Sequence, residues 1–369
     1  MSLHIVGAGW VTPLGRGVDE VWKRLVRGDE ASAQRISGEG DKTYSGFLVP
    51  TDALKDLPQH PRLRRVSAIS RFAVAAGLDA MTHAESFTPK IDMERVALVF
   101  AASNGGVAYT KRFYHGIVVS GAQSASPLLF PETVFNAPAS HLAAILGING
   151  ASYTVVGDGA VGILAIKMAS DLLESESIDF CLVVGAEEAD WILCDAYAKW
   201  RLIKAQPPIE TFREPPRGTI LSEGAGALLL AREGRVQIDS INAGGNFSHQ
   251  RDAANAVHRI LRNLRGQNAG IVASANGTFV DLAERVAIKK GMSDAVVYTP
   301  KAALGESVGA SAIWQVIVAA KALQEKRFPP MLHTHLEAGL RFTPDAAGPS
   351  VIVLSCGLNQ QAAGLRLSI

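Results

Sequence analysis

One stretch of the sequence indicates which fold the chain adopts: Ala151-Ser-Tyr-Thr-Val-Val-Gly-Asp-Gly-Ala-Val-Gly-Ile-Leu-Ala-Ile-Lys-Met-Ala-Ser-Asp-Leu-Leu173. Residues 151–156 are β-prone and predict a strand, residues 157–160 predict a tight turn, and residues 161–173 predict an almost wholly apolar helix. The free N–H groups of such a helix point at the turn, where they can stabilise an anion. A nucleophile is expected at Gly159, yet no side chain in this turn can attack a carbonyl.

Short β-branched segments alternate with helical patterns along the chain, which is typical of α/β layering with sheets covered on both faces. Strands are predicted at 3–12, 95–102, 151–156, 180–185 and 224–231, and again at 236–243, 270–274, 295–299, 350–355 and 363–367. In each half a central strand leads into a helix that is apolar on nearly every face, at 161–173 and at 308–323. Such a helix must be buried on all sides, so we infer an internal duplication with both helices between two sheets.

The two halves are expected at residues 1–233 and 234–369. The junction at 232–235 is too short for a flexible linker, so the halves are expected to form one rigid unit. At 369 residues and 48% hydrophobic content, the chain can bury a large core.

Composition excludes several classes of partner. The 36 basic and 35 acidic residues are nearly balanced, which gives no sign of nucleic-acid or membrane-surface binding. Three scattered cysteines argue against a disulfide framework and for a reducing cytoplasm, and no stretch approaches the ~20 apolar residues of a membrane span. One small basic group could receive an acidic carrier protein or form a solvated helix face: Lys23, Arg24, Arg27, Arg62, Arg64 and Arg65.

The turn at Gly159 resembles the active-site elbow of the β-ketoacyl synthases when it is aligned, without a gap, through Gly-Ala-Glu-Glu-Ala at 185–189. In that family a Cys begins the helix and takes up the acyl chain, and Gly159 stands at its position. Residues 275–278 resemble the motif of the first catalytic His, and residues 301–310 that of the second. These alignments place Asn276 and Glu306 at the two His positions.

The resemblance runs nearly end to end. Lys301, Gly305 and Glu284 match the family pattern, and further similar segments lie at 5–14, 126–131, 136–142, 223–226 and 329–330. The glycine-rich loop near the C-terminus survives only at 355–359. The resemblance implies a thiolase-like five-layer αβαβα sandwich built from two duplicated halves.

All three catalytic side chains of the family are substituted. Decarboxylative condensation needs a thiolate, together with donors that stabilise the enolate. Glycine offers no sulfur, and a carboxylate at 306 would repel the developing negative charge. Loss of one such donor costs on the order of 10²–10³ in rate, so we expect no useful condensation by this chain alone.

Three residues near the elbow allow more than one interpretation. Cys356 is either a relocated nucleophile or a small residue at the end of a buried strand. Glu306 either pairs with Lys301 or acts as a new general base. Asp158 is expected to be a helix N-cap rather than a base.

Histidines offer neither a base nor a metal site. His141 is expected to be a hydrogen-bonded packing residue, because no nucleophile adjoins it. His333 and His335 lack a third ligand nearby in sequence. We therefore expect no metal and no cofactor.

Ketosynthase-like chains without the nucleophile are known chiefly as chain-length factors, which pair with an active ketosynthase. The leading hypothesis is such a non-catalytic subunit, with an acyl carrier protein as a further partner and with Asn104 and Phe135 at the acyl tunnel or the dimer contact. One alternative is a stand-alone thioester-processing enzyme that uses Glu306, Asn276 and Cys356. The other is a homodimeric module that binds an acyl group or a carrier protein.

Overall fold

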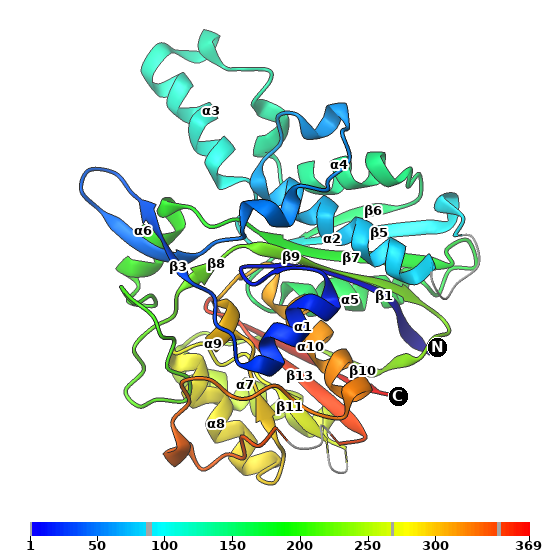
Figure 1. Ribbon diagram of the computed structural model, residues 1–369, viewed down its shortest axis with the longest axis vertical. Helices are drawn as coiled ribbons and strands as arrows, with labels where there is room; N and C mark the ends of the chain where they lie inside the picture. Colours follow the sequence, from blue (N-terminus) through cyan, green and yellow to red (C-terminus); the bar gives the residue numbers. More distant parts are fainter. Residues whose placement is uncertain (1, 86–90, 267–268, 345–347) are drawn as a thin grey trace.

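A computed structural model describes residues 2–85, 91–266, 269–344 and 348–369 (Figure 1). Ten strands follow one hydrogen-bonded path with two equal halves. The first half runs β6 (Ser152–Val156), β5 (Val96–Ala102), β7 (Phe180–Glu187), β9 (Gly224–Ala231), β1 (Leu3–Thr12). The second runs β12 (Val297–Tyr298), β11 (Gly270–Val272), β13 (Ser350–Cys356), β14 (Gln361–Ser368), β10 (Val236–Asn246).

Both halves have the same topology. Numbered along the chain, the strands of each half lie in the order 3-2-4-5-1. In each half the first two pairings along the path are parallel and the last two are antiparallel. The halves join where β1 pairs antiparallel with β10, Leu3 opposite Ile238. This repeat confirms the duplication; the boundary at 233/234 stays a prediction and falls between β9 and β10.

Helices complete five layers. The central layer holds α5 (Val161–Leu172) and α10 (Ser311–Glu325), which contact each other and strands of both halves. One outer layer holds α2 (Ala68–Glu85) and α4 (Ala137–Leu146), and the other holds α7 (Ala253–Leu264) and α8 (Phe279–Gly291). The thiolase-like sandwich expected from the sequence is therefore confirmed.

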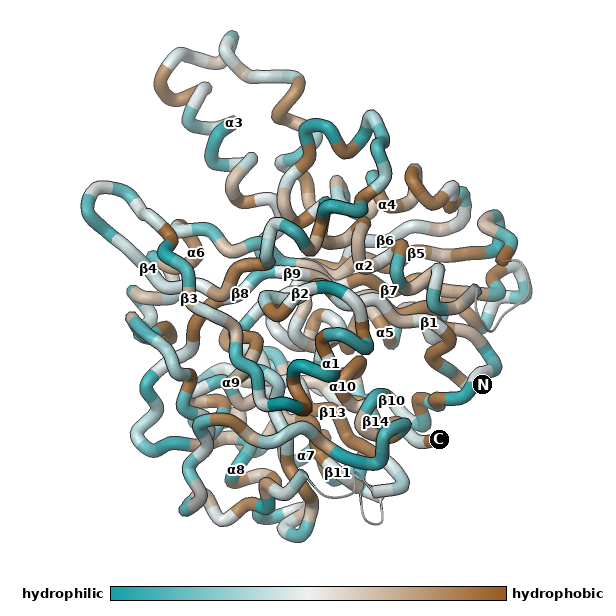
Figure 2. The backbone as a smooth tube through the Cα atoms, in the orientation of Figure 1, coloured by the Kyte–Doolittle hydropathy of each residue, from teal (hydrophilic) through white to brown (hydrophobic). Residues whose placement is uncertain are grey.

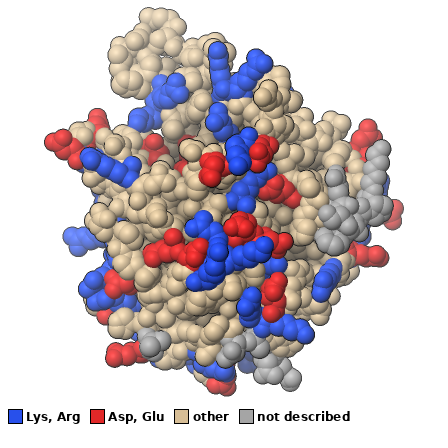
Figure 3. Space-filling model, viewed as in Figure 1, with Lys and Arg blue, Asp and Glu red and all other residues tan. Residues whose placement is uncertain are grey.

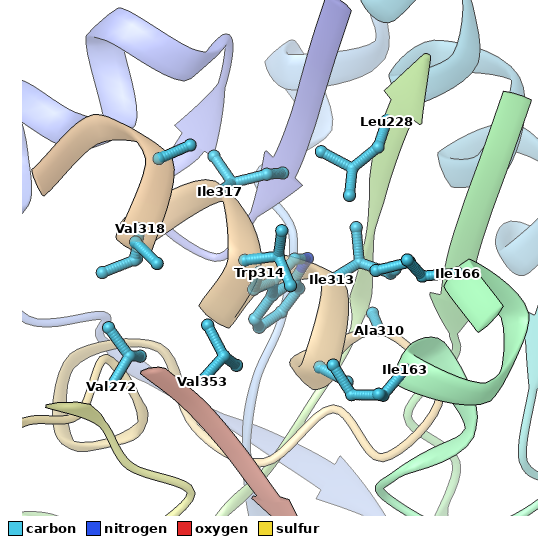
Figure 4. Packing of buried hydrophobic residues seen from close by; sticks show 14 of the residues in the cluster. Ile163, Ile166, Leu228, Val272, Ala310, Ile313, Trp314, Ile317, Val318 and Val353 are labelled. Carbon is cyan, nitrogen blue, oxygen red and sulfur yellow. The ribbon is translucent and has the colours of Figure 1, made fainter. Parts of the chain in front are cut away.

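The core lies around the two central helices (Figure 4). Trp314 and Ile313 of α10 pack against Ile163 and Ile166 of α5 and against strands of both halves of the sheet. Close packing requires a glycine in β9, because a Cβ on Gly226 would lie 2.7 Å from Ile313 Cγ2. All but the last few residues of α10 are buried, as its uniformly apolar sequence predicts.

The prediction of burial on all sides is wrong for α5. Leu164 and Met168 are only partly buried, and Asp171 is exposed. This face of α5 is exposed because the helix packs on β6, the last strand of the sheet, and so lies at the edge of the layer.

Element bounds differ from the expected ones mainly in the second half. β11 and β12 are shorter than predicted, and α10 begins at Ser311 because residues 308–310 form a turn. A small sheet of β3 (Ala33–Ser37), β4 (Thr43–Phe47) and β8 (Leu221–Ser222) was not foreseen.

Further helices and a short strand surround these layers, and α3 projects from the body (Figure 1). They are β2 (Gly15–Arg16), α1 (Val18–Arg27), α3 (Val107–Ser120), α6 (Trp191–Lys199) and α9 (Lys301–Leu304). Single 3₁₀ turns are η1 (Thr51–Leu54), η2 (Pro61–Leu63), η3 (Met93–Arg95), η4 (Ala122–Ser124), η5 (Phe130–Thr133), η6 (Gln250–Asp252) and η7 (Leu336–Ala338). Within the described ranges, no helix is long and apolar enough to cross a membrane.

Candidate functional site

The elbow has the predicted geometry. β6 ends at Val156, a turn follows, and α5 begins at Val161. The turn packs against the loop of residues 357–360, which joins β13 to β14. A Cβ placed on Gly159 would lie 3.0 Å from the Cα of Gly357, so a larger residue at the elbow requires a small shift of that loop.

Asp158 does not cap α5, so the N-cap prediction is wrong. Ala160 occupies the cap position, and no side chain caps the helix. The Asp158 carboxylate instead accepts the backbone N–H of Asn359 at 2.8 Å. Burial raises the pKa of Asp158 above its ordinary value, while backbone N–H donors oppose that rise.

The two positions of the missing histidines are in direct contact. Asn276 follows β11 and is buried, and its Nδ2 donates to Glu306 Oε2 at 2.6 Å. The Asn276 Oδ1 accepts both the backbone N–H and the hydroxyl of Thr278. Both ends of this amide are therefore held by neighbours in the chain.

Glu306 accepts two further hydrogen bonds. Lys301 Nζ donates to its Oε2 at 2.7 Å, and Ser311 Oγ donates to its Oε1 at 2.9 Å. The Lys301 and Glu306 side chains are each only 3% exposed. The ion pair considered from the sequence is confirmed.

Gly305 allows the chain to turn between α9 and Glu306. Its φ of +81° is favourable only for glycine, and a Cβ would lie 2.8 Å from the Ser222 Cβ. A backbone bond from Glu306 N–H to Ile220 O fixes the segment beyond the turn. The family-pattern glycine thus places the carboxylate in the network.

A second buried network adjoins the first. Glu284 of α8 accepts from the backbone N–H and the hydroxyl of Ser274, at 2.9 and 2.6 Å. The Ser274 Oγ in turn accepts the N–H of Cys356 at 2.8 Å. Burial raises the pKa of Glu284 to about 7.

Cys356 lies in an environment that disfavours a thiolate. The side chain is buried at the end of β13. Burial, followed by the charges of Glu284 and Asp158, raises the pKa of the thiol well above its ordinary value. A reactive cysteine needs the opposite electrostatics.

Asn104 follows the end of β5, and Phe135 lies close to it. The Phe135 ring covers Gly105, where a Cβ would lie 2.9 Å from Phe135 Cδ1. The Asn104 side chain faces the Tyr197 hydroxyl, whose pKa is raised by burial. A role for these residues in an acyl tunnel stays a prediction.

Sequence reasoning missed a group of buried carboxyls. Glu187 accepts the N–H groups of Ser103 and Gly309, which lie in separate halves of the chain, and burial raises its pKa to about 8. Burial also raises the pKa of Glu188 and of Glu223 to about 7. The only sequence signal was the Glu-Glu pair at 187–188, which the alignment used as an anchor.

Two of the histidines considered from the sequence, His141 and His333, contact carboxylates. His141 Nε2 lies 2.5 Å from Glu132 Oε1, and His333 Nε2 lies 2.7 Å from Glu30 Oε2. The packing role expected for His141 is confirmed. In the described part of the chain, no group of three or more His, Cys, Asp or Glu could hold a metal ion.

Two five-stranded repeats around a pair of central helices, with a strand–turn–helix elbow, define the thiolase-like class of proteins. Within that class, the family models for the β-ketoacyl synthase N-terminal domain and C-terminal domain match residues 2–235 and 234–335. The chain belongs to the β-ketoacyl synthase family, and the resemblance noted in the sequence is confirmed.

Relatives named as synthases are distant in sequence. The 3-oxoacyl-(acyl-carrier-protein) synthase 2 of Vibrio cholerae is 22% identical over 363 residues, covering 89% of this chain and 87% of that protein. The enzyme of the same name from Rhizobium meliloti is 24% identical over 374 residues, covering 89% and 88%.

Solved structures match over the whole chain. The ishigamide ketosynthase/chain length factor has a TM-score of 0.87 at 21% identity, covering 100% of this chain and 98% of that chain. A β-ketoacyl synthase from Burkholderia phymatum has a TM-score of 0.85 at 18% identity, covering 100% and 99%. The ketosynthase ApeO in complex with its chain length factor ApeC, from Xenorhabdus doucetiae, has a TM-score of 0.83 at 19% identity, covering 100% and 98%.

Proposed function

We propose that this chain is a non-catalytic, ketosynthase-like subunit of the chain-length-factor type. It pairs with an active β-ketoacyl-ACP synthase in type II fatty acid, polyketide or polyene biosynthesis. One observation carries the proposal: Asn276 donates to Glu306, which also binds Lys301. With no thiol at Gly159, the site lacks a nucleophile and offers a hydrogen-bonded carboxylate where a condensing enzyme needs donors.

The contacts of the remaining candidates argue against a stand-alone thioester enzyme. Glu306 accepts three hydrogen bonds, one of them from a lysine ammonium, so it has little tendency to take a proton from a substrate. The Cys356 thiol is buried among carboxylates, which disfavours the thiolate. Neither residue has the environment of an activated catalytic group.

The edge strand β6 supports pairing with another subunit. Among the strands that the structure describes, it pairs only with β5, and Tyr153 and Val156 on it are 43% and 49% exposed. Residues 151–156 carry no charge. An uncharged, β-prone edge invites strand pairing, so we expect a partner's strand to continue the sheet here.

The projecting arm of α3, η4 and η5 adds exposed apolar surface (Figure 1). Residues 116–131 contain no charged side chain, and the projecting tip is free of charge in Figure 3. Hydrophobic segments follow the same arm in Figure 2. Its exposed large apolar side chains are Tyr114, Val118, Val119, Leu128, Phe130, Val134 and Phe135. Surface of this kind marks an interface.

A ketosynthase is the partner that the structural neighbours favour. Their descriptions include ketosynthases with chain length factors and a type II polyketide acyl-carrier protein bound to its ketosynthase. We extend both partners, ketosynthase and carrier protein, to this chain. The basic side chains of α1 are partly neutralised, since Arg24 and Arg27 both pair with Asp29, which favours the solvated-face interpretation there.

Co-expression with a ketosynthase encoded beside this gene tests the proposal. We expect the two chains to co-purify and Val156→Asp to abolish co-purification, because it places a charge in the new strand pair. Val286→Asp is the matched control, since Val286 is 45% exposed on α8, an outer-layer helix of the second half. A wild-type chain that stays monomeric and binds no neighbouring ketosynthase contradicts the proposal. Self-association alone favours the homodimeric module.

A further inference from the structure

The end of β13 and the loop that follows it are both bonded to the elbow. The Asn359 N–H of the loop donates to Asp158 Oδ2 at 2.8 Å, and the Ser355 hydroxyl of β13 donates to the Gly159 carbonyl at 2.8 Å. The Gly357 Cα lies 3.0 Å from the point where a side chain at 159 would begin. These contacts join residues about 200 positions apart in the chain.

The Asp158 carboxylate occupies the space beside Gly357 that a side chain at position 357 would need. A Cβ on Gly357 would lie 1.8 Å from the Oδ2 of Asp158, so no side chain can stand at 357 while the carboxylate is in place. Asp158 is only 9% exposed. The backbone N–H groups of Gly159 and Gln361 also hold the pKa of this carboxyl down against its burial. An anion supplied by the chain itself therefore already occupies the elbow and binds the Asn359 N–H.

We propose that Asp158 is a latch that holds the β13–β14 loop closed on the elbow, so that no external acyl or anionic group reaches the start of α5. Asp158 acts as a positioning residue, because it fixes a loop and touches no substrate. The latch is a property of the chain by itself. It goes beyond the pairing proposed above and stands or falls without it.

The latch predicts that two changes, one at Asp158 and one at Gly357, have non-additive effects on the loop. Removal of the carboxylate by Asp158→Ala frees the Asn359 N–H and loosens the loop. Gly357→Ala loosens the same loop from the other side, through steric overlap with the carboxylate. In the double variant that overlap is absent, so the two perturbations should be far from additive.

Hydrogen exchange on the purified full chain tests the proposal. We expect Asp158→Ala to speed amide exchange in residues 357–361 about tenfold or more, since a hydrogen bond to a charged group is lost. Exchange in β1 and β9 should stay unchanged. The double variant Asp158→Ala/Gly357→Ala should show less exchange and a smaller fall in Tm than the two single changes predict by addition.

Controls keep the test decisive. Asp41→Asn, at an exposed aspartate, should leave exchange at 357–361 unchanged. Asp158→Asn keeps an acceptor oxygen and should lie between wild type and Asp158→Ala; it also serves if Gly357→Ala fails to fold. Unchanged exchange in Asp158→Ala, or strictly additive effects in the double variant, overturns the latch. Neither outcome bears on ketosynthase pairing.

Discussion

The Lys301–Glu306 pair gives the sharpest test of the network that replaces the catalytic histidines. The two charges are 2.7 Å apart, and both side chains are almost fully buried. At an effective dielectric of ~20, their attraction is about 6 kcal/mol. Glu306→Gln removes this attraction and leaves the buried ammonium with a neutral amide oxygen in place of a carboxylate. Breaking a buried pair from one side typically costs about 3–5 kcal/mol, and we expect that loss in the free energy of unfolding.

Urea unfolding followed by far-UV circular dichroism measures the effect. Asp171→Asn is the matched control, because it breaks the exposed Lys167–Asp171 pair of α5 and should cost about 0.3–0.5 kcal/mol. Lys301→Met combined with Glu306→Gln should recover a large part of the loss, since no unpaired charge remains. A loss in Glu306→Gln as small as that of the control would refute the reasoning.

Three further outcomes are expected. Gly159→Cys alone should give no condensation or acyl adduct by intact mass, because the new side chain meets Gly357 and the imidazoles are absent; measurable turnover would contradict this. Burial raises the pKa of Glu187 to about 8 and of Glu188 to about 7, so the native state binds their protons more tightly than the unfolded chain. Stability should therefore fall as pH rises from about 5 to about 8, with a slope of up to ~1.4 kcal/mol per pH unit for each carboxyl, in urea titrations at fixed salt. With a partner ketosynthase, Phe135→Trp should change product length by mass spectrometry without abolishing turnover, and unchanged products would remove Phe135 from the tunnel.

The sequence predicted most of the architecture because the relevant signals are local. The apolar residues on nearly every face of α10 indicate a helix enclosed by strands of both halves, and the β-prone run before Gly157 indicates the strand at the elbow. The same signal misled for α5, whose face beside β6 stays partly exposed. A hydrophobic pattern does not distinguish a face covered by the chain itself from one left at a sheet edge.

Contacts distant in sequence set the parts that could not be predicted. Asp158 reads as a helix cap from its neighbours, but its partner Asn359 lies 201 residues away. The β3–β4 hairpin gains its third strand from β8, far along the chain. Motif alignment placed Asn276 and Glu306 at related positions, yet only the structure brings the amide onto the carboxylate.

The residues that replace the catalytic side chains of the family fit one another in pairs. An amide at 276 suits a carboxylate at 306, and that carboxylate neutralises a buried Lys301. Glycine at 159 likewise suits the close approach of Gly357, whose own missing side chain suits the Asp158 carboxylate. Simple loss of catalysis would leave buried donors and charges without partners, at a cost of about 1–3 kcal/mol for each unsatisfied group. At positions 276, 301 and 306 these groups are instead paired with one another, as the proposed non-catalytic role requires.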